Sequence, residues 1–263
     1  LTFLAKAKEF IENNKKQPFF LYYALTEPHV PRMPSTMFKG KSNLGYRGDA
    51  ILQMDWTVGE IMKQLESLGI AKNTMIIFSS DNGPVLDDGY EDEAVSKLNG
   101  HTPAGVLRGG KYSTFEGGTR VPLIVSWPSK TKTAISEAMV CQIDFMASFS
   151  KMLNIQPKDI ETTDSEDMLD VLLGKSNKGR TVLVEQGINS LAIIRDHWKY
   201  IEPNKGPALN SLTNTELGNN PLPQLYDLKN DIGEKNNIAI EKPEITNELA
   251  GLLRKTKDKK TKD

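Results

Sequence analysis

The stretch Thr74-Met-Ile-Ile-Phe-Ser-Ser-Asp-Asn-Gly-Pro84 joins a short apolar run to a carboxylate, an amide and a Gly-Pro turn. A continuous apolar run is typical of a strand in a sheet covered on both faces, and it predicts a strand from Met75 to Ser80. Before it, apolar side chains from Asp49 to Leu68 repeat with the 3.6-residue period of an amphipathic helix. Asp49 is the expected N-cap of this helix, and Gly69 is its expected stop.

Helices and strands alternate along the first part of the chain. Apolar residues at helical spacing from Leu4 to Ile11 precede an apolar run from Phe19 to Leu25, which predicts a helix and then a buried strand. The segment from Val121 to Trp127 predicts another strand, and the segment from Ile143 to Leu153 a further helix. This alternation predicts an α/β fold whose sheet is covered on both sides.

Beyond about Leu153 the apolar runs become short and closely spaced. Runs at 181–185, 191–195 and 198–201 predict an antiparallel meander, to which 225–228 adds a strand and 245–253 a closing helix. We therefore expect a large α/β domain over 1–160 and a small α+β subdomain with an antiparallel sheet over 161–254. The charged tail at 255–263 is expected to be disordered.

Composition excludes several classes of function. The chain has 263 residues, of which 38% are hydrophobic. Its net charge of -1 gives no indication of nucleic-acid binding. No run approaches the roughly 18 apolar residues that span a bilayer, so we expect no membrane span. The chain shows no secretory signal, and because its opening at Leu1 reads as the middle of a domain we expect it to be truncated there. The one cysteine, Cys141, is interpreted as a small buried core residue.

Two segments carry side chains suited to chemistry at the ends of predicted strands. Asp81 and Asn82 lie at the edge where α/β sheets bind ligands, and their oxygen donors suit Ca²⁺ or Mg²⁺. An Asx-Gly turn without a metal is the simpler interpretation of this dipeptide alone. His29 lies between Pro28 and Pro31, which stiffen its loop as proton transfer requires, and a solvated loop histidine is the alternative.

A third segment, residues 107–122, is rich in glycine and cations. Gly109 and Gly110 let the backbone approach a ligand closely, and Lys111 then supplies a compact charge to the oxygens of an anion. Gly-Gly-Lys alone is weak, and the spacing of a phosphate-binding P-loop is missing. The whole run of sixteen residues, 107–122, is a far more specific signal than Gly-Gly-Lys alone.

Taken in order, the segments 27–31, 74–84 and 107–122 resemble the formylglycine-dependent sulfatases of the arylsulfatase A type, in the alkaline phosphatase superfamily. The resemblance implies an alkaline-phosphatase-like mixed sheet flanked by helices, of which this chain holds the second half. It implies that His29 protonates the bridging oxygen of a sulfate ester and that Lys111 binds sulfate. It also implies that Asp81 and Asn82 are two ligands of Ca²⁺, with Mg²⁺ as the alternative.

Other polar residues are weaker candidates. His101 and Arg108 lie shortly before Lys111 and are predicted to contact a sugar. Glu116 and Arg120 are expected to shape the turn and pair internally. An acidic loop is interpreted as a solvated rim rather than a second metal site; it consists of Asp87, Asp88, Glu91, Asp92 and Glu93.

The chain lacks the family's nucleophile segment, Cys/Ser-x-Pro-x-Arg, whose cysteine or serine becomes formylglycine. The nearest imitation, Ser126-Trp-Pro-Ser-Lys130, ends in lysine and is rejected. The family's paired aspartates and Lys-x-His segment are also missing from these residues. We expect all of them upstream of Leu1, so the chain needs its own upstream half and is expected to be inactive alone.

The resemblance implies a sulfuric ester hydrolase that acts on a sulfated carbohydrate or an aryl sulfate, in a periplasmic or secreted protein. The expected sugars are 4- or 6-sulfated galactose or N-acetylgalactosamine. Two alternatives remain open. One is a phosphoesterase or phosphonate hydrolase of the same superfamily, which usually needs more metal ligands than three histidines allow. The other is a non-catalytic module that binds sulfated glycans.

Overall fold

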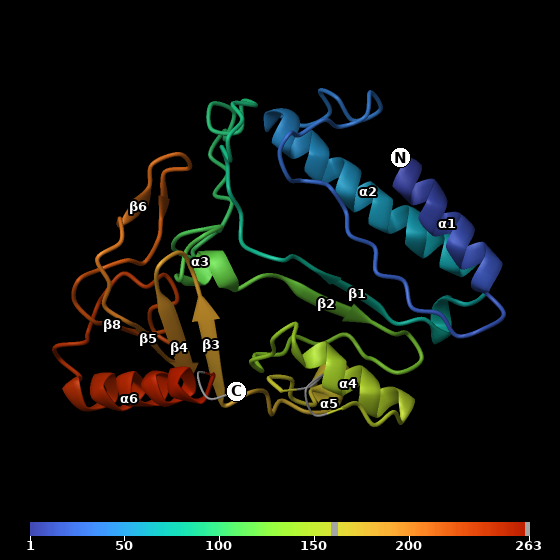
Figure 1. Cartoon of the computed structure of the whole chain (residues 1–263). Helices are drawn as coiled ribbons and strands as arrows, with labels where there is room; N and C mark the ends of the chain where they lie inside the picture. Colours follow the sequence, from blue (N-terminus) through green and yellow to red (C-terminus); the bar gives the residue numbers. More distant parts are fainter. Residues whose placement is uncertain (159–162, 261–263) are drawn as a thin grey trace.

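The computed structural model describes residues 1–158 and 163–260. Two helices lie side by side at one end of the molecule, a sheet with a helix lies at the other end, and two paired strands run between them (Figure 1). The helices are α1 (Thr2–Asn14), α2 (Gly45–Ser67), the 3-10 turn η1 (Ala71–Asn73), α3 (Glu116–Thr119), α4 (Asp144–Leu153), α5 (Leu169–Leu172) and α6 (Pro243–Lys260). The strands are β1 (Ile76–Ser79), β2 (Leu123–Ser126), β3 (Val182–Gln186), β4 (Leu191–Arg195), β5 (Trp198–Ile201), β6 (Leu209–Asn210), β7 (Thr215–Glu216) and β8 (Gln224–Asp227).

Helix α1 packs against α2 through the apolar face that its spacing predicts. In α2 the predicted apolar face is only partly buried: Met62 is 42% exposed, whereas the polar Gln53 and Thr57 are buried. Leu4, Ala7 and Ile11 of α1 are buried, as is Leu65 of α2. None of the helices in the described residues is long and apolar enough to cross a membrane.

The start of α2 differs from the prediction, whereas its end agrees. The helix begins at Gly45, so Asp49 lies inside it and is not its N-cap. The Asp49 carboxylate instead accepts hydrogen bonds from the backbone N–H groups of Gly40 (2.7 Å) and Ser42 (2.8 Å), and so holds the preceding loop. The helix stops before Gly69, whose φ of 70° is the left-handed conformation that ends many helices.

Strands β1 and β2 form a two-stranded antiparallel sheet in which Ile76 lies opposite Ser126. Both strands were predicted, but the expectation of a sheet covered on both faces is not met within the described residues, because Ile124 is 60% exposed. The strand predicted from Phe19 to Leu25 is wrong. This segment is extended, but no described strand runs beside it, so its backbone joins no ladder.

Helix α4 begins one residue later than its pattern predicts and ends at the predicted residue, Leu153. Its first residue, Asp144, is buried and forms an ion pair of 2.6 Å with Arg180. The Asp144 carboxylate also accepts a hydrogen bond of 2.9 Å from the backbone N–H of Cys141. Cys141 carries a free thiol and is half-buried, so it is not the fully buried core residue that was expected.

The C-terminal part forms the predicted antiparallel sheet, with strand order β3-β4-β5-β8. Helix α6 covers one face of it (Figure 1). Leu249 and Leu253 of α6 pack against Ile193, Tyr200 and Leu225 of the sheet. The predicted antiparallel sheet and closing helix of the C-terminal part are confirmed by this arrangement.

The tail predicted to be disordered from residue 255 is helical as far as Lys260, and 261–263 lie outside the described residues. Lysine is a good helix former, so a charged segment can extend a helix that packing has already nucleated. The Lys257 ammonium pairs with Glu202 at 2.9 Å, and the Thr256 hydroxyl donates to the Leu252 carbonyl at 3.1 Å. The charge pattern indicated exposure, which a surface helix also provides.

The other face of this sheet supports the glycine-rich run, residues 107–122. Ala192, Ile201 and Tyr226 pack against Phe115, and the rings of Phe115 and Tyr226 meet edge to face at 6.0 Å. The C-terminal sheet therefore lies between α6 and the segment that carries Lys111.

A buried charge cluster joins the C-terminal sheet to the glycine-rich run. The Lys199 ammonium on β5 has no exposed surface and lies 2.8 Å from Glu116, 3.0 Å from Glu185 and 3.5 Å from Glu234. Burial alone would lower the pKa of Lys199, but the three carboxylates raise it, so the ammonium stays charged. Glu234 also accepts a hydrogen bond of 2.6 Å from the backbone N–H of Glu116 at the start of α3.

Replacing Lys199 by methionine is expected to destabilise the fold by about 3–5 kcal/mol, because the carboxylates around it are left buried without a counter-charge. Urea unfolding measures this loss. The control is Lys229→Met, at an exposed lysine of the same subdomain. Equal stability of the two variants would contradict the role given to the cluster.

The same cluster makes stability depend on pH. Burial raises the pKa of Glu234 to about 7, although Lys199 opposes the shift. The folded state then binds a proton that the unfolded chain has lost, so this contribution is complete below about pH 4.5 and is lost as the pH rises through about 7. Urea unfolding between about pH 5 and pH 8 should show a falling free energy of unfolding that Glu234→Gln flattens. An unchanged slope in that variant would assign the proton elsewhere.

Candidate active site

His29 lies on the loop that follows the extended segment after α1. Its backbone N–H donates to the Thr26 carbonyl at 3.0 Å, and its Nδ1 lies 2.7 Å from the Val30 carbonyl oxygen. Because a carbonyl only accepts, Nδ1 carries the proton of the neutral ring, and Nε2 presents its lone pair. The side chain is 62% exposed.

Arg32 fixes this loop, and the sequence reasoning missed it. Its side chain is only 2% exposed and pairs with Asp92 at 2.9 Å. The same guanidinium donates to the carbonyls of Pro28 (2.9 Å), Leu86 (2.7 Å) and Val85 (2.9 Å). It therefore ties the histidine loop to the segment that follows Asp81 and Asn82. An arginine directly after His-Val-Pro was the available signal.

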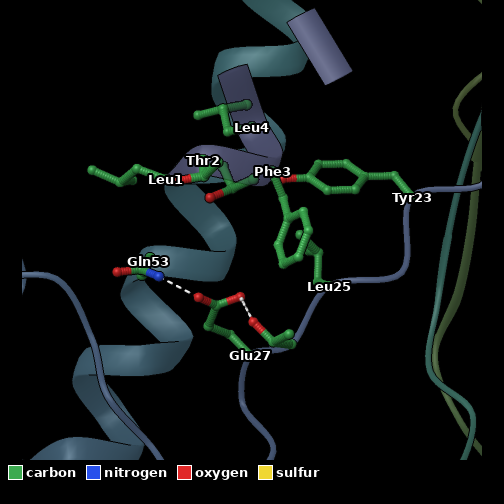
Figure 2. Close-up of a pocket in the computed structure, with 10 residues that line it drawn as sticks. Leu1, Thr2, Phe3, Leu4, Tyr23, Leu25, Glu27 and Gln53 are labelled. Atoms are coloured by element: carbon green, nitrogen blue, oxygen red, sulfur yellow. Dashed lines mark hydrogen bonds between the residues drawn. The ribbon is translucent and has the colours of Figure 1, made fainter. Parts of the chain in front are cut away.

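Helix α2 holds the same loop from the other side. The Gln53 amide donates to the Glu27 carboxylate, which also accepts from the Thr26 hydroxyl at 3.0 Å (Figure 2). Gln53 accepts in turn from the backbone N–H of Ser35 at 2.7 Å. Thr26, Glu27 and Gln53 line a pocket between the start of α1, the extended segment and α2 (Figure 2).

Lys111 and His29 come together although they are far apart in the sequence. The Lys111 ammonium lies 3.1 Å from His29 Nε2 and 2.7 Å from an Asp88 carboxylate oxygen. Burial alone would lower the pKa of Lys111, but the hydrogen bond and charge of Asp88 raise it, so the ammonium stays protonated. A cation and an imidazole thus lie in contact, as is required to bind an ester anion and to protonate it.

The turn after β1 is seated directly on the glycine-rich run. The backbone N–H of Gly83 donates to the Gly118 carbonyl at 2.9 Å, and that of Lys111 donates to the Pro84 carbonyl at 2.9 Å. A Cβ on Gly83 would lie 1.7 Å from the Gly117 carbonyl oxygen, so only glycine permits this approach. The glycines of both segments serve close backbone contact, which places the Asp81 and Asn82 segment beside Lys111.

The donors at this turn fit a hard cation only in part. The Asn82 side-chain N–H donates to the Gly83 carbonyl at 2.9 Å, which leaves its Oδ1 as a free acceptor. The Asp81 carboxylate is exposed. Carboxylate and amide oxygens suit Ca²⁺, which takes six to eight of them. Within the described residues no group of three or more His, Cys, Asp or Glu side chains forms a metal site, so Asp81 and Asn82 would supply only part of a shell.

The two predicted sugar contacts lie in different settings. His101 is exposed on the loop before the glycine-rich run. Arg108 is engaged by the protein: it pairs with Glu216 at 2.7 Å, donates to the Glu234 carbonyl at 2.8 Å, and lies over the Phe115 ring at 4.1 Å. The Arg108 side chain thus braces the glycine-rich run against β7. Contact of either residue with a sugar stays a prediction.

Two residues of the acidic loop do not form the solvated rim that was expected. Asp88 binds Lys111 and also accepts a hydrogen bond of 2.7 Å from the Tyr112 hydroxyl. Asp92 binds the buried Arg32. Both interpretations failed because the pairing partners lie far away in the sequence. The expectation for Glu116 and Arg120 is confirmed by their ion pair of 3.2 Å, although Glu116 also binds Lys199.

With this geometry in place, comparison with known proteins identifies the family. The family model for sulfatases matches residues 2–155. The chain belongs to the sulfatase family. An N-acetylgalactosamine-6-O-sulfatase of Bacteroides thetaiotaomicron is 52% identical over 96% of this chain and 50% of that protein. Human arylsulfatase A is 28% identical over 95% of this chain and 51% of its own length.

A solved structure agrees with the fold of this sulfatase chain. It comes from work on glycosaminoglycan metabolism by Bacteroides thetaiotaomicron, superposes with a TM-score of 0.95 at 51% identity, and covers 97% of this chain and 53% of that one. The predicted alkaline-phosphatase-like sulfatase fold is thereby confirmed. The chain spans about half the length of the relatives that it matches.

The contact between the two turns gives a direct test. Gly83→Ala is expected to lower the melting temperature of the protein, because the new methyl group would overlap the Gly117 carbonyl. Gly59→Ala is the matched control, since its Cβ would meet nothing within 4 Å and it lies inside α2, where alanine is favoured by about 1 kcal/mol. Equal melting temperatures for the two variants would show that the turns are not in contact.

Proposed function

We propose that the protein is a sulfuric ester hydrolase that releases sulfate from sulfated sugars, and that this chain supplies half of its active site. One observation carries the proposal: His29 Nε2 and the Lys111 ammonium are 3.1 Å apart. The Asp81 and Asn82 turn is bonded to the same glycine-rich run. The family membership supports the reaction class, and the half-length match supports a site completed by a segment outside these 263 residues.

In this proposal Lys111 binds the non-bridging oxygens of the ester sulfate. Negative charge grows on the sulfate and the leaving oxygen as the S–O bond breaks, so a fixed ammonium stabilises the transition state more than the bound substrate. Asp81 and Asn82 would hold a calcium ion that shares this task. A formylglycine hydrate, formed from a residue outside the chain, would supply the nucleophile.

His29 would protonate the departing sugar oxygen from Nε2. The ring receives the Lys111 hydrogen bond at Nε2, so it cannot carry a proton there at the same time. A bound sulfate offers Lys111 a stronger acceptor, and its negative charge favours the protonated imidazole. Binding of the ester therefore frees Nε2 and charges the ring that must deliver the proton.

For the sugar, we propose 6-sulfated N-acetylgalactosamine. The relative that is 52% identical is named an N-acetylgalactosamine-6-O-sulfatase, and it covers nearly the whole chain. His101, exposed on the loop before Lys111, is available to contact a sugar hydroxyl. Arg108 would do so only if the sugar replaced Glu216 as its partner.

His29→Ala in the full-length enzyme is expected to lower kcat for a sugar 6-sulfate about 10²- to 10⁴-fold, the usual contribution of a general acid. The loss should be much smaller for 4-nitrophenyl sulfate, because its phenolate leaves without a proton. Steady-state kinetics on both substrates checks this.

The control is His197→Ala, which removes a partly exposed imidazole in the turn between β4 and β5. It should leave both rates unchanged. Equal losses on the two substrates in His29→Ala would assign His29 to binding rather than to proton donation.

A further inference from the structure

The acidic loop after β1 reaches into the site through a single side chain. Asp88 Oδ2 accepts from the Lys111 ammonium at 2.7 Å, while Oδ1 accepts from the Tyr112 hydroxyl at 2.7 Å. The side chains of Asp88 and Lys111 are only 15% and 16% exposed, in contrast to the open imidazole of His29. Asp88 thus uses both carboxylate oxygens to hold two consecutive residues of the glycine-rich run.

The backbone between those two residues is strained. Tyr112 has a φ of 83°, a left-handed conformation that residues with a side chain rarely adopt. Its carbonyl accepts from the backbone N–H of Ile188 at 3.0 Å, and the Lys111 ammonium lies 5.2 Å from its ring. The side chains of Lys111 and Tyr112 both bond Asp88 from this conformation.

We propose that Asp88, clamped by Tyr112, is a positioning residue that aims the Lys111 ammonium at the sulfate and at His29. This inference deepens the proposed function and rests on it. An ammonium has three N–H donors. In the structure one is bonded to Asp88 and one points to His29 Nε2. When the ester binds and Nε2 is freed, that second donor and the third are both available to sulfate oxygens. Asp88 reaches the reacting atoms only through Lys111.

The geometry explains why an anion site contains a carboxylate. Asp88 Oδ2 lies 2.7 Å from the Lys111 ammonium and 4.0 Å from His29 Nε2. It keeps the half-buried lysine protonated before substrate arrives, because its hydrogen bond and charge outweigh the effect of burial. The ammonium is then held by a short bond instead of sampling the rotamers of a long side chain.

The test uses the full-length enzyme with three variants, Asp88→Asn, Asp88→Ala and Tyr112→Phe. We expect kcat to fall about 10- to 100-fold in Asp88→Asn, which can still accept one of the two hydrogen bonds, and further in Asp88→Ala. KM should change little, because the ammonium remains near the sulfate. Tyr112→Phe should have the smallest effect. Losses that appear in KM alone would overturn the positioning role.

The alkaline limb of the pH profile separates positioning from general damage. Removing Asp88 leaves burial to act on Lys111, so its pKa falls and activity is lost at a lower pH than in the wild-type enzyme. Asp87→Asn is the matched control, with the same charge change one residue away and no bond to Lys111. An alkaline limb that stays in place in Asp88→Asn, or moves equally in Asp87→Asn, would overturn the proposal.

A readout without any ester separates this proposal from the proposed function. The Lys111 ammonium is titrated by NMR on protein with isotope-labelled lysine, with the resonance assigned through Lys111→Arg. A lower titration midpoint in Asp88→Asn supports the clamp even if the wild-type enzyme hydrolyses no sulfate ester. An unchanged midpoint in folded Asp88→Asn protein, checked by circular dichroism, overturns it whatever the activity.

Discussion

The buried ammonium of Lys199 is the constraint on which the rest of the structure depends. It stands on the C-terminal sheet, yet its partner Glu116 belongs to the glycine-rich run, so it joins two parts that are distant in the sequence. A charge with no exposed surface is tolerable only when its partners are in place. Glu234 completes the connection by accepting the backbone N–H that opens α3. The glycine-rich run is therefore tied to the C-terminal sheet by buried charges and a backbone hydrogen bond.

From this support the site is assembled mainly through the backbone. The run carries Lys111 and bonds the turn after β1, where Gly83 permits contact at a distance that excludes any side chain. Arg32 then anchors the histidine loop to the residues that follow that turn. Three segments that carry no regular secondary structure at their functional residues are thus held by a short series of hydrogen bonds and buried ions.

The sequence predicted what local chemistry determines. Apolar spacing located most helices and strands, and motif spacing placed His29 and Lys111, which the structure brings into contact. It failed where the outcome depends on a distant partner. Lys199 looked like an ordinary residue of a meander strand, and Asp88 like one more solvated acid, because nothing in the neighbouring residues reveals an ion pair across the fold. The run from Phe19 to Leu25 likewise needed a neighbouring strand to become one.

The central claim is that one small anion can contact both the Lys111 ammonium and His29 Nε2. A crystal structure of the full-length protein with calcium and sulfate tests it most directly. The account predicts one sulfate within hydrogen-bond distance of both the Lys111 ammonium and His29 Nε2, and a calcium ion about 2.3–2.6 Å from oxygens of Asp81 and Asn82. Sulfate bound away from Lys111 and His29, or calcium coordinated without Asp81 and Asn82, would contradict it.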